Sequence, residues 1–133
     1  MSEVLEKMQT RRSIRRYKSD MVPKDVIEKI VEAGTFAASG MNLQTPVIVA
    51  VTNKEIRDKM AKANAQVMGS ENDPFYGAPV VLVVLAEKKG TYVYDGSLVM
   101  GNLMLAAHEL GIGSCWIHRA KEVFEQEEWK QWL

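Results

Sequence analysis

Apolar residues recur every three to four positions in several stretches of the chain, which is the spacing of one face of an α-helix. Such amphipathic helices are predicted over residues 2–9, 23–33, 54–68 and 121–132. Gly34 is placed to end the second of these helices, and Asn53 is a favourable N-cap for the third. The packing residues expected in the final helix are Val123, Phe124, Trp129 and Trp132.

Residues 91–110 predict a longer helix of a different kind, because apolar side chains cover most of its circumference. Gly111 follows this helix and is suited to cap its C-terminus. A helix with so little polar surface is expected to lie in a core or in a subunit interface.

Three apolar runs show no helical period and favour buried strands. They lie at residues 46–52, 79–86 and 112–117. Gly, Asn, Asp and Pro are frequent in residues 69–77, so a mobile loop is expected there. The mixture of helices and buried strands places the protein in the α/β or α+β class.

Composition narrows the choice of function. The 133 residues correspond to one domain, and the 17 basic residues balance the 17 acidic ones, which argues against a nucleic-acid partner. The longest apolar run, at residues 78–86, is too short to span a bilayer, and the N-terminus lacks the pattern of a signal peptide. The single cysteine, Cys115, excludes an internal disulfide framework, so a soluble cytoplasmic protein is expected.

Residues 11–17, Arg-Arg-Ser-Ile-Arg-Arg-Tyr, concentrate four guanidinium groups in a chain of zero net charge. Arginine presents a planar fork of donors that matches the oxygens of a phosphate, so this stretch is a candidate anion site. Taken alone, the cluster is explained equally well by surface ion pairs with Asp20, Asp25 or Glu28. A basic arm that binds nucleic acid is disfavoured by the balanced charge.

Residues 37–46 form a second candidate segment, between a predicted helix and a predicted strand. Ser39, Asn42 and Gln44 carry short hydroxyl and amide groups that suit the polar edge of a flat heterocycle. The same residue types are ordinary turn formers, so turn chemistry alone is the alternative.

Residues 110–119 form a third candidate segment, and its Gly-Ile-Gly sequence would let a backbone approach a ligand closely. It is not a dinucleotide fingerprint, because a predicted strand rather than a helix follows it. Cys115 is more typical of a buried small hydrophobe than of a nucleophile, and His108 of a structural histidine. The spacing of His108, His118 and Cys115 does not indicate a metal site.

Four motifs follow one another in a fixed order over nearly the whole chain. They are Arg-Arg-Ser-Ile-Arg at 11–15, Ser-Gly-Met-Asn-Leu-Gln-Thr-Pro at 39–46, Ala-Pro-Val-Val at 78–81 and Leu-Gly-Ile-Gly-Ser-Cys-Trp at 110–116. Together they resemble the FMN-dependent nitroreductase family. The resemblance implies an α+β fold, with a three-layer α-β-α sandwich around a mixed, mainly antiparallel sheet. It implies one FMN-binding domain over residues 1–133, in a dimer.

The resemblance also implies which residues hold the cofactor. In the family, the early basic motif binds the FMN phosphate and the second motif reaches the flavin from the partner subunit. The strand after the Gly-Ile-Gly turn passes the reactive edge of the flavin ring. These roles fall on Arg11, Arg12, Ser13 and Arg15, on Ser39, Gly40, Asn42 and Gln44, and on Trp116, Ile117, His118 and Arg119. No catalytic acid, base or nucleophile is expected, because the flavin carries the reaction.

The implied activity is a ping-pong exchange between NADH or NADPH and a nitroaromatic, quinone or similar acceptor, with FMN as the carrier of the hydride. Members form homodimers with FMN at the interface, which suits the apolar helix expected over residues 91–110. Family chains continue past the last helix with a segment that crosses to the partner, whereas this chain ends at Leu133. The alternative is therefore a flavin-binding protein with little or no turnover.

Overall fold

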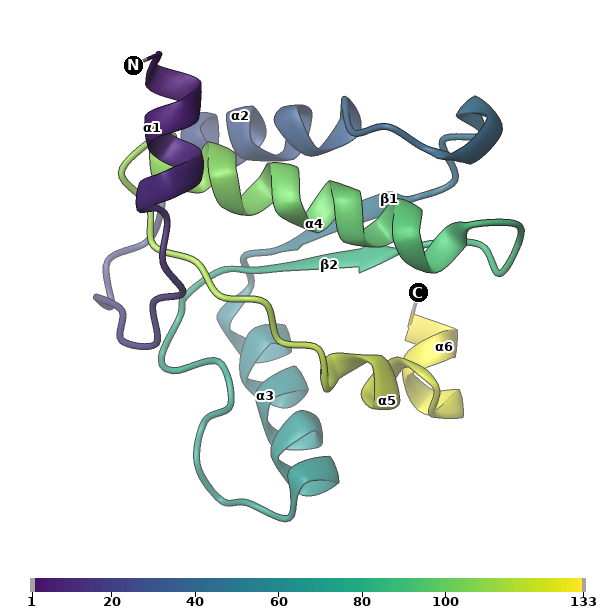
Figure 1. Ribbon diagram of the computed structural model, residues 1–133. Coiled ribbons are helices and arrows are strands. Elements are labelled where there is room, and N and C mark those ends of the chain that lie inside the picture. Colours follow the sequence, from purple (N-terminus) through teal and green to yellow (C-terminus); the bar gives the residue numbers. More distant parts are fainter. Residues whose placement is uncertain (1, 133) are drawn as a thin grey trace.

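The computed structural model describes residues 2–132 and shows a small sheet between two layers of helices (Figure 1). The strands are β1 (Val47–Val51) and β2 (Val81–Leu85), which pair in antiparallel fashion with Val49 opposite Val83. The helices are α1 (Glu3–Thr10), α2 (Lys24–Thr35), α3 (Lys54–Met68), α4 (Tyr92–Glu109), α5 (Ala120–Phe124) and α6 (Glu127–Trp132), with a 3-10 turn, η1, at Gly40–Asn42.

Each face of the sheet packs against its own group of helices, because successive side chains of a strand point to opposite faces. Ile48 and Val84 pack with α2 and α4, around buried Leu103. Val51 and Val83 pack on the other face with α3 and α5. These three layers confirm the predicted α+β sandwich.

Local signals place the ends of the helices. The side chain of Asn53 accepts a hydrogen bond of 3.0 Å from the amide of Ile56, so the predicted N-cap is confirmed. The expected end of α2 at Gly34 is wrong, since the helix continues to Thr35 and Gly34 is buried within it. Its small size serves packing, because a Cβ at Gly34 would lie 2.6 Å from a methyl carbon of Leu103.

The predicted apolar helix is α4, which is buried on one side and exposed on the other. Val99, Leu103 and Ala107 lie in the core. On the opposite side, Tyr94 is 72% and Leu98 50% exposed. None of the helices in residues 2–132 is long and apolar enough to cross a membrane.

The prediction of a third strand over residues 112–117 is wrong. This segment makes only an isolated parallel bridge, between Ser114 and Ser13. A strand is defined by its ladder of hydrogen bonds to a neighbour. Residues 112–117 instead line a cavity, which β2 lines as well.

The predicted helix over residues 121–132 is divided into α5 and α6. Val123 and Trp129 are both buried, with 1% and 4% of their surface exposed. Six residues apart on one straight helix, they would point about 120° away from each other. The break after Phe124 lets both side chains reach the same core.

Candidate functional site

The arginine-rich stretch lies against the segment that contains Gly-Ile-Gly. The amide of Ile14 donates a 2.9 Å hydrogen bond to the carbonyl of Ser114, next to the bridge between Ser13 and Ser114. A Cβ at Gly113 would lie 3.2 Å from three carbons of Ile14, so glycine permits this approach. Two motifs about 100 residues apart in the sequence are thus neighbours in the fold, at the ends of α1 and α4 (Figure 1).

The arginine side chains differ in what they contact. Arg12 Nη1 donates hydrogen bonds of 2.8 Å to the carbonyls of Gln9 and Arg11 and so caps the C-terminal end of α1. Arg11 Nη1 is buried and has no hydrogen-bond partner within the described residues. Arg15 is exposed. None of the ion pairs among residues 2–132 involves an arginine of the 11–16 stretch, which removes surface pairing with Asp20, Asp25 or Glu28 as its explanation.

Tyr17 closes the arginine-rich stretch and packs rather than reaching outward. Its hydroxyl donates a short hydrogen bond to the carbonyl of Ile14. Burial raises the pKa of Tyr17 to about 12, and the nearby charge of Arg15 offsets only part of that rise. The phenol therefore stays neutral at ordinary pH and supports the backbone of the stretch.

The second motif, Ser39–Gln44, is a tight polar turn. Ser39 Oγ accepts a 3.0 Å bond from the amide of Gln44, and Gln44 Nε2 donates a 2.7 Å bond to Asn42 Oδ1. Outside the turn, the amide of Gly40 donates a 2.9 Å bond to Asp95 Oδ1 at the start of α4. Asn42 and Gln44 are exposed, so polar groups face outward from a fixed turn.

The third candidate segment, residues 110–119, is called the third motif from here on. Its last residues, Trp116 to Arg119, present a mixed set of groups. Trp116 is 42% exposed and meets the ring of His118 edge to face, with centroids 6.2 Å apart. Ile117 is partly buried, packs against the core on the α3 side of the sheet and also lines the cavity described below. His118 and Arg119 are exposed at the start of α5.

The second motif lies apart from the other two within one chain, whereas the first and third are neighbours. The first is joined to the C-terminal end of α4, where Thr10 Oγ1 lies 2.9 Å from His108 Nε2, which confirms His108 as a structural histidine. The second is joined to the N-terminal end of α4 through Asp95. These two anchor residues are about 20 Å apart along the helix axis. Figure 1 shows η1 and α1 at opposite ends of the molecule.

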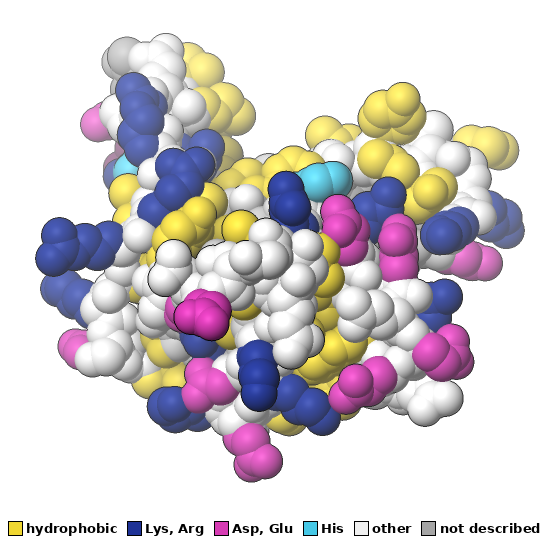
Figure 2. All heavy atoms as spheres, turned by 90° about the horizontal axis from the view of Figure 1, so that it is seen from below, with side chains coloured by type: hydrophobic (Ala, Val, Ile, Leu, Met, Phe, Trp, Pro, Cys, Tyr) yellow, Lys and Arg dark blue, Asp and Glu magenta, His cyan; other side chains and the backbone are white. Residues whose placement is uncertain are grey.

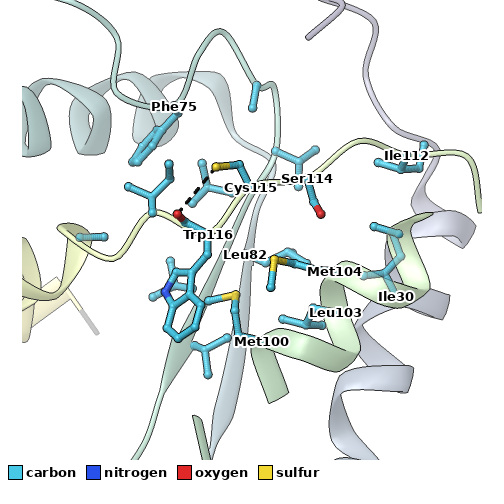
Figure 3. Close-up of a pocket in the computed structure, with 18 of the residues that line it drawn as sticks. Ile30, Phe75, Leu82, Met100, Leu103, Met104, Ile112, Ser114, Cys115 and Trp116 are labelled. Carbon is cyan, nitrogen blue, oxygen red and sulfur yellow. Dashed lines mark hydrogen bonds between the residues drawn. The ribbon is translucent and has the colours of Figure 1, made fainter. Parts of the chain in front are cut away.

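A largely apolar cavity of about 890 Å³ lies between β2, α4 and the third motif. Figure 3 shows Met100, Leu103 and Met104 of α4 along one side, with Phe75 and Trp116 on others. Cys115 borders it, half-buried, with Sγ 3.8 Å from the carbonyl oxygen of Trp116. This setting fits the small apolar role predicted for Cys115. No cluster suited to a metal ion occurs among residues 2–132.

Exposed hydrophobic side chains gather at two places. Figure 2 shows them on the lobe formed by α1 and again at the opposite side of the molecule. Met8 of α1 is 59% exposed, and beside the second motif Phe36 and Met41 are 78% and 93% exposed. Patches of this kind mark surfaces that meet a partner or ligand.

Sequence reasoning missed Asp95, which links α4 to the second motif. Its carboxylate is 3% exposed and accepts hydrogen bonds from both Gly40 and Thr91. A signal was present, because Asp95 is the only acidic residue in the apolar stretch from 91 to 108. A buried carboxylate in such a helix needs specific donors, which the sequence does not name.

Comparison with known proteins agrees with the fold. The model of the nitroreductase family matches residues 8–80 and 68–133. The chain belongs to the nitroreductase family. A nitroreductase from Bacteroides fragilis with bound FMN is 33% identical and superposes with a TM-score of 0.88, over 100% of this chain and 79% of that one. One from Desulfitobacterium hafniense, also with bound FMN, is 30% identical with a TM-score of 0.88, over 100% and 81%.

Among curated relatives, a Methanothermobacter thermautotrophicus protein is 32% identical over 124 residues, which are 86% of this chain. Its name is "Putative NADH dehydrogenase/NAD(P)H nitroreductase". An NADH dehydrogenase of Thermus thermophilus is 32% identical over 122 residues, or 92% of this chain. The chain spans 60% of the first relative's length and 56% of the second's.

Proposed function

We propose that the protein is an FMN-dependent oxidoreductase that passes a hydride from NADH or NADPH to a nitroaromatic, quinone or similar acceptor. The observation that carries this proposal is the buried, unpartnered Nη1 of Arg11. A buried guanidinium nitrogen without an acceptor costs free energy, and a phosphate oxygen is the acceptor that its geometry suits best. The FMN-bound relatives with the same fold support this choice of anion.

The residues around Arg11 fit a phosphate. Ser13 adds a hydroxyl on the same stretch. Arg15 adds a second guanidinium, which is exposed. Arg12 would contribute less, because its Nη1 already donates to two carbonyls of the chain. Gly113 leaves the space beside Ile14 that lets this stretch lie close to the third motif.

The other two motifs would hold the flavin ring. The exposed amides of Asn42 and Gln44, with Ser39 and Gly40, would meet its polar edge, and residues 116–119 would border its reactive edge. Since the first and second motifs are joined to opposite ends of α4, one flavin would be held by two subunits of a homodimer. The exposed apolar side of α4 and the patches on α1 and η1 are suited to that interface.

When bound, FMN would supply the hydride chemistry, first taking a hydride from the nicotinamide and then giving it to an acceptor in a ping-pong sequence. The chain's own residues would bind and orient. Trp116 would cover the ring region with an apolar surface, and Arg119 would provide a positive charge near it. We place this reaction in the cytoplasm, with residues 1–133 as one FMN-binding domain.

The visible spectrum of the purified protein tests the proposal. We expect flavin bands at close to one equivalent per chain, which disappear when NADH or NADPH is added without oxygen. Flavin bands that persist would favour the second reading, a flavin-binding protein without turnover. A colourless protein that takes up no added FMN would overturn both.

A comparison of two ligands tests the phosphate contact. Arg11→Ala should weaken FMN binding by about tenfold to a hundredfold, because a charge-assisted hydrogen bond is lost, and should leave riboflavin binding nearly unchanged. Lys29→Ala is the control, an exposed cation on α2 outside the proposed site. Equal losses for both ligands would show that Arg11 does not hold the phosphate.

A further inference from the structure

Asp95 joins the second motif to α4 through a buried carboxylate. Its Oδ1 accepts a 2.9 Å hydrogen bond from the amide of Gly40 and a 3.0 Å bond from the hydroxyl of Thr91. Asp95 is 3% exposed, and the bond to Gly40 spans 55 positions of the sequence. None of the ion pairs in residues 2–132 includes it, so these donors and the first turn of α4 compensate its charge.

The turn that Asp95 holds has an unusual backbone. Met41, Asn42 and Gln44 have φ values of 53°, 54° and 53°, in the left-handed region that residues with a Cβ avoid. The bonds from Gln44 to Ser39 and Asn42 fix the shape of the turn. They do not fix its position, since all three residues lie within the turn itself. Strained segments of this kind persist only where the surroundings over-determine them.

Gly40 makes the link to α4 specific. A Cβ at this position would lie 2.1 Å from Thr91 Oγ1, so only glycine lets the backbone reach the hydroxyl and the carboxylate beside it. The same contact brings the Gly40 amide within 2.9 Å of Asp95 Oδ1. The turn is therefore seated on α4 at one point, which consists of Gly40, Thr91 and Asp95.

We infer that Asp95 is a positioning residue for flavin binding, which holds the Ser39–Gln44 turn where its polar groups meet the ring. This inference rests on the proposed function. It assigns phosphate binding and ring binding to opposite ends of α4, because the phosphate-binding stretch is joined to the helix at His108 and the ring-binding turn at Asp95. Loss of Asp95 should therefore weaken FMN and riboflavin by the same factor, in contrast to loss of Arg11.

Two substitutions at one site provide the test. Asp95→Leu removes the acceptor at similar volume and should weaken both flavins by about tenfold to a hundredfold. Asp95→Asn keeps an oxygen that can accept from Gly40 and Thr91, and should restore affinity to within about threefold of the wild type. Ser97→Ala is the matched control on the same helix, because among residues 2–132 its hydroxyl bonds to the carbonyl of Val93 and not to the Ser39–Gln44 turn.

Amide hydrogen exchange at Gly40 in the flavin-free protein provides a second, independent readout. Asp95→Leu should accelerate this exchange, while Asp95→Asn and Ser97→Ala should not. If Asp95→Leu does not fold, Asp95→Ala removes the same acceptor without adding an apolar side chain and should produce the same equal loss of both flavins.

Three outcomes would overturn the inference. Unchanged flavin affinity in Asp95→Leu, beside a wild type that binds flavin, would refute it and leave the proposed function intact. A selective loss of FMN would place Asp95 with the phosphate instead. A wild type that binds neither flavin would refute the proposed function and with it this role of Asp95. The exchange of Gly40 would then still report whether the carboxylate anchors the turn.

Discussion

The two sides of the sheet differ in whether a buried arginine is paired and in how many large apolar side chains are exposed. On the side of α3, α5 and α6, which we call the closed half, Arg57 is buried. Its Nε donates a 2.7 Å bond to the carbonyl of Ala78, and its Nη2 bonds to Asp73. Asp73 also accepts from the amides of Phe75 and Gly77. The loop over residues 69–77, expected from its composition to be mobile, is thus fixed by hydrogen bonds.

The other side, with α1, the Ser39–Gln44 turn and the outer face of α4, forms the open half. Here Arg11 Nη1 is buried without a partner, and Phe36, Met41 and Tyr94 are 72% exposed or more. The polar groups that do pair, such as Gly40 with Asp95, hold backbone in place and leave side chains free to face outward.

This difference teaches where function is to be sought. The closed half pairs its buried Arg57 and buries Phe75 and Trp129, so it is built for stability of the chain. A half that leaves a guanidinium nitrogen and large apolar side chains without partners fits a ligand and a second subunit. Substitutions in the closed half should therefore change the free energy of unfolding, and those in the open half should change binding.

The largest expected effect is that of Trp129→Ala in the closed half. Trp129 is 4% exposed and its ring lies 5.8 Å from that of Phe124. Truncation should reduce the free energy of unfolding by about 3–5 kcal/mol, measured by urea denaturation. Trp132→Ala, at a ring that is 39% exposed, should cost clearly less. Equal costs would show that α6 is not part of the core.

Arg57→Ala should have the next largest effect, about 2–4 kcal/mol of unfolding free energy. The substitution leaves Asp73 and the carbonyl of Ala78 without their donor. Lys62→Ala, at an exposed cation on the same helix, should change stability by less than about 0.5 kcal/mol. A similar small change in both variants would mean that the loop is held by other contacts.

The pairing of Asp73 predicts how stability depends on pH. Partial burial alone would raise its pKa, but hydrogen bonds from Arg57 and from the amides of Phe75 and Gly77 lower it below the ordinary value. Because the pKa of Asp73 is lower in the folded than in the unfolded state, its ionised carboxylate stabilises the protein above about pH 4. This stabilisation is lost as the pH falls through the pKa of the folded state. The advantage of wild type over Asp73→Asn should therefore shrink on acidification below about pH 4. A constant difference in urea midpoint would contradict this.

One residue of the closed half departs from the pattern. Asn64 in α3 is fully buried, and neither its amide nitrogen nor its oxygen has a partner within the described residues. Asn64→Leu, similar in size and without polar groups, should raise the free energy of unfolding by about 1 kcal/mol. A loss of stability by urea denaturation would show that the amide is satisfied in solution by a group such as a buried water.

The sequence was a good guide where the determining contacts are local. The helix that begins at Asn53 depends on neighbouring positions and was predicted, and the strand over residues 47–51 was predicted from its run of apolar, largely β-branched residues. Residues 112–117 were misassigned because a strand also needs a neighbour to pair with, which their own sequence does not specify. For the same reason Arg57 and Asp95 escaped notice, since their partners Ala78 and Gly40 lie 21 and 55 positions away.

The smallest expected effect on the chain's own stability is that of Tyr94→Ser in the open half. Tyr94 is 72% exposed on the outer face of α4, so the isolated subunit should lose less than about 0.5 kcal/mol. In a dimer that buries this face, the variant should dissociate at a higher protein concentration than wild type. Because dimerisation stabilises the folded chain, the unfolding midpoint of wild type should rise with protein concentration. The midpoint of the variant should not.

Sedimentation velocity over a dilution series measures this directly, with Lys29→Ser on α2 as an exposed control. The variant should also bind FMN more weakly, because the Ser39–Gln44 turn and the arginine-rich stretch would hold one flavin only when two subunits meet. Undiminished FMN binding by a monomeric Tyr94→Ser protein would contradict that link. It would require a single chain to bind the cofactor although its two anchors on α4 are about 20 Å apart.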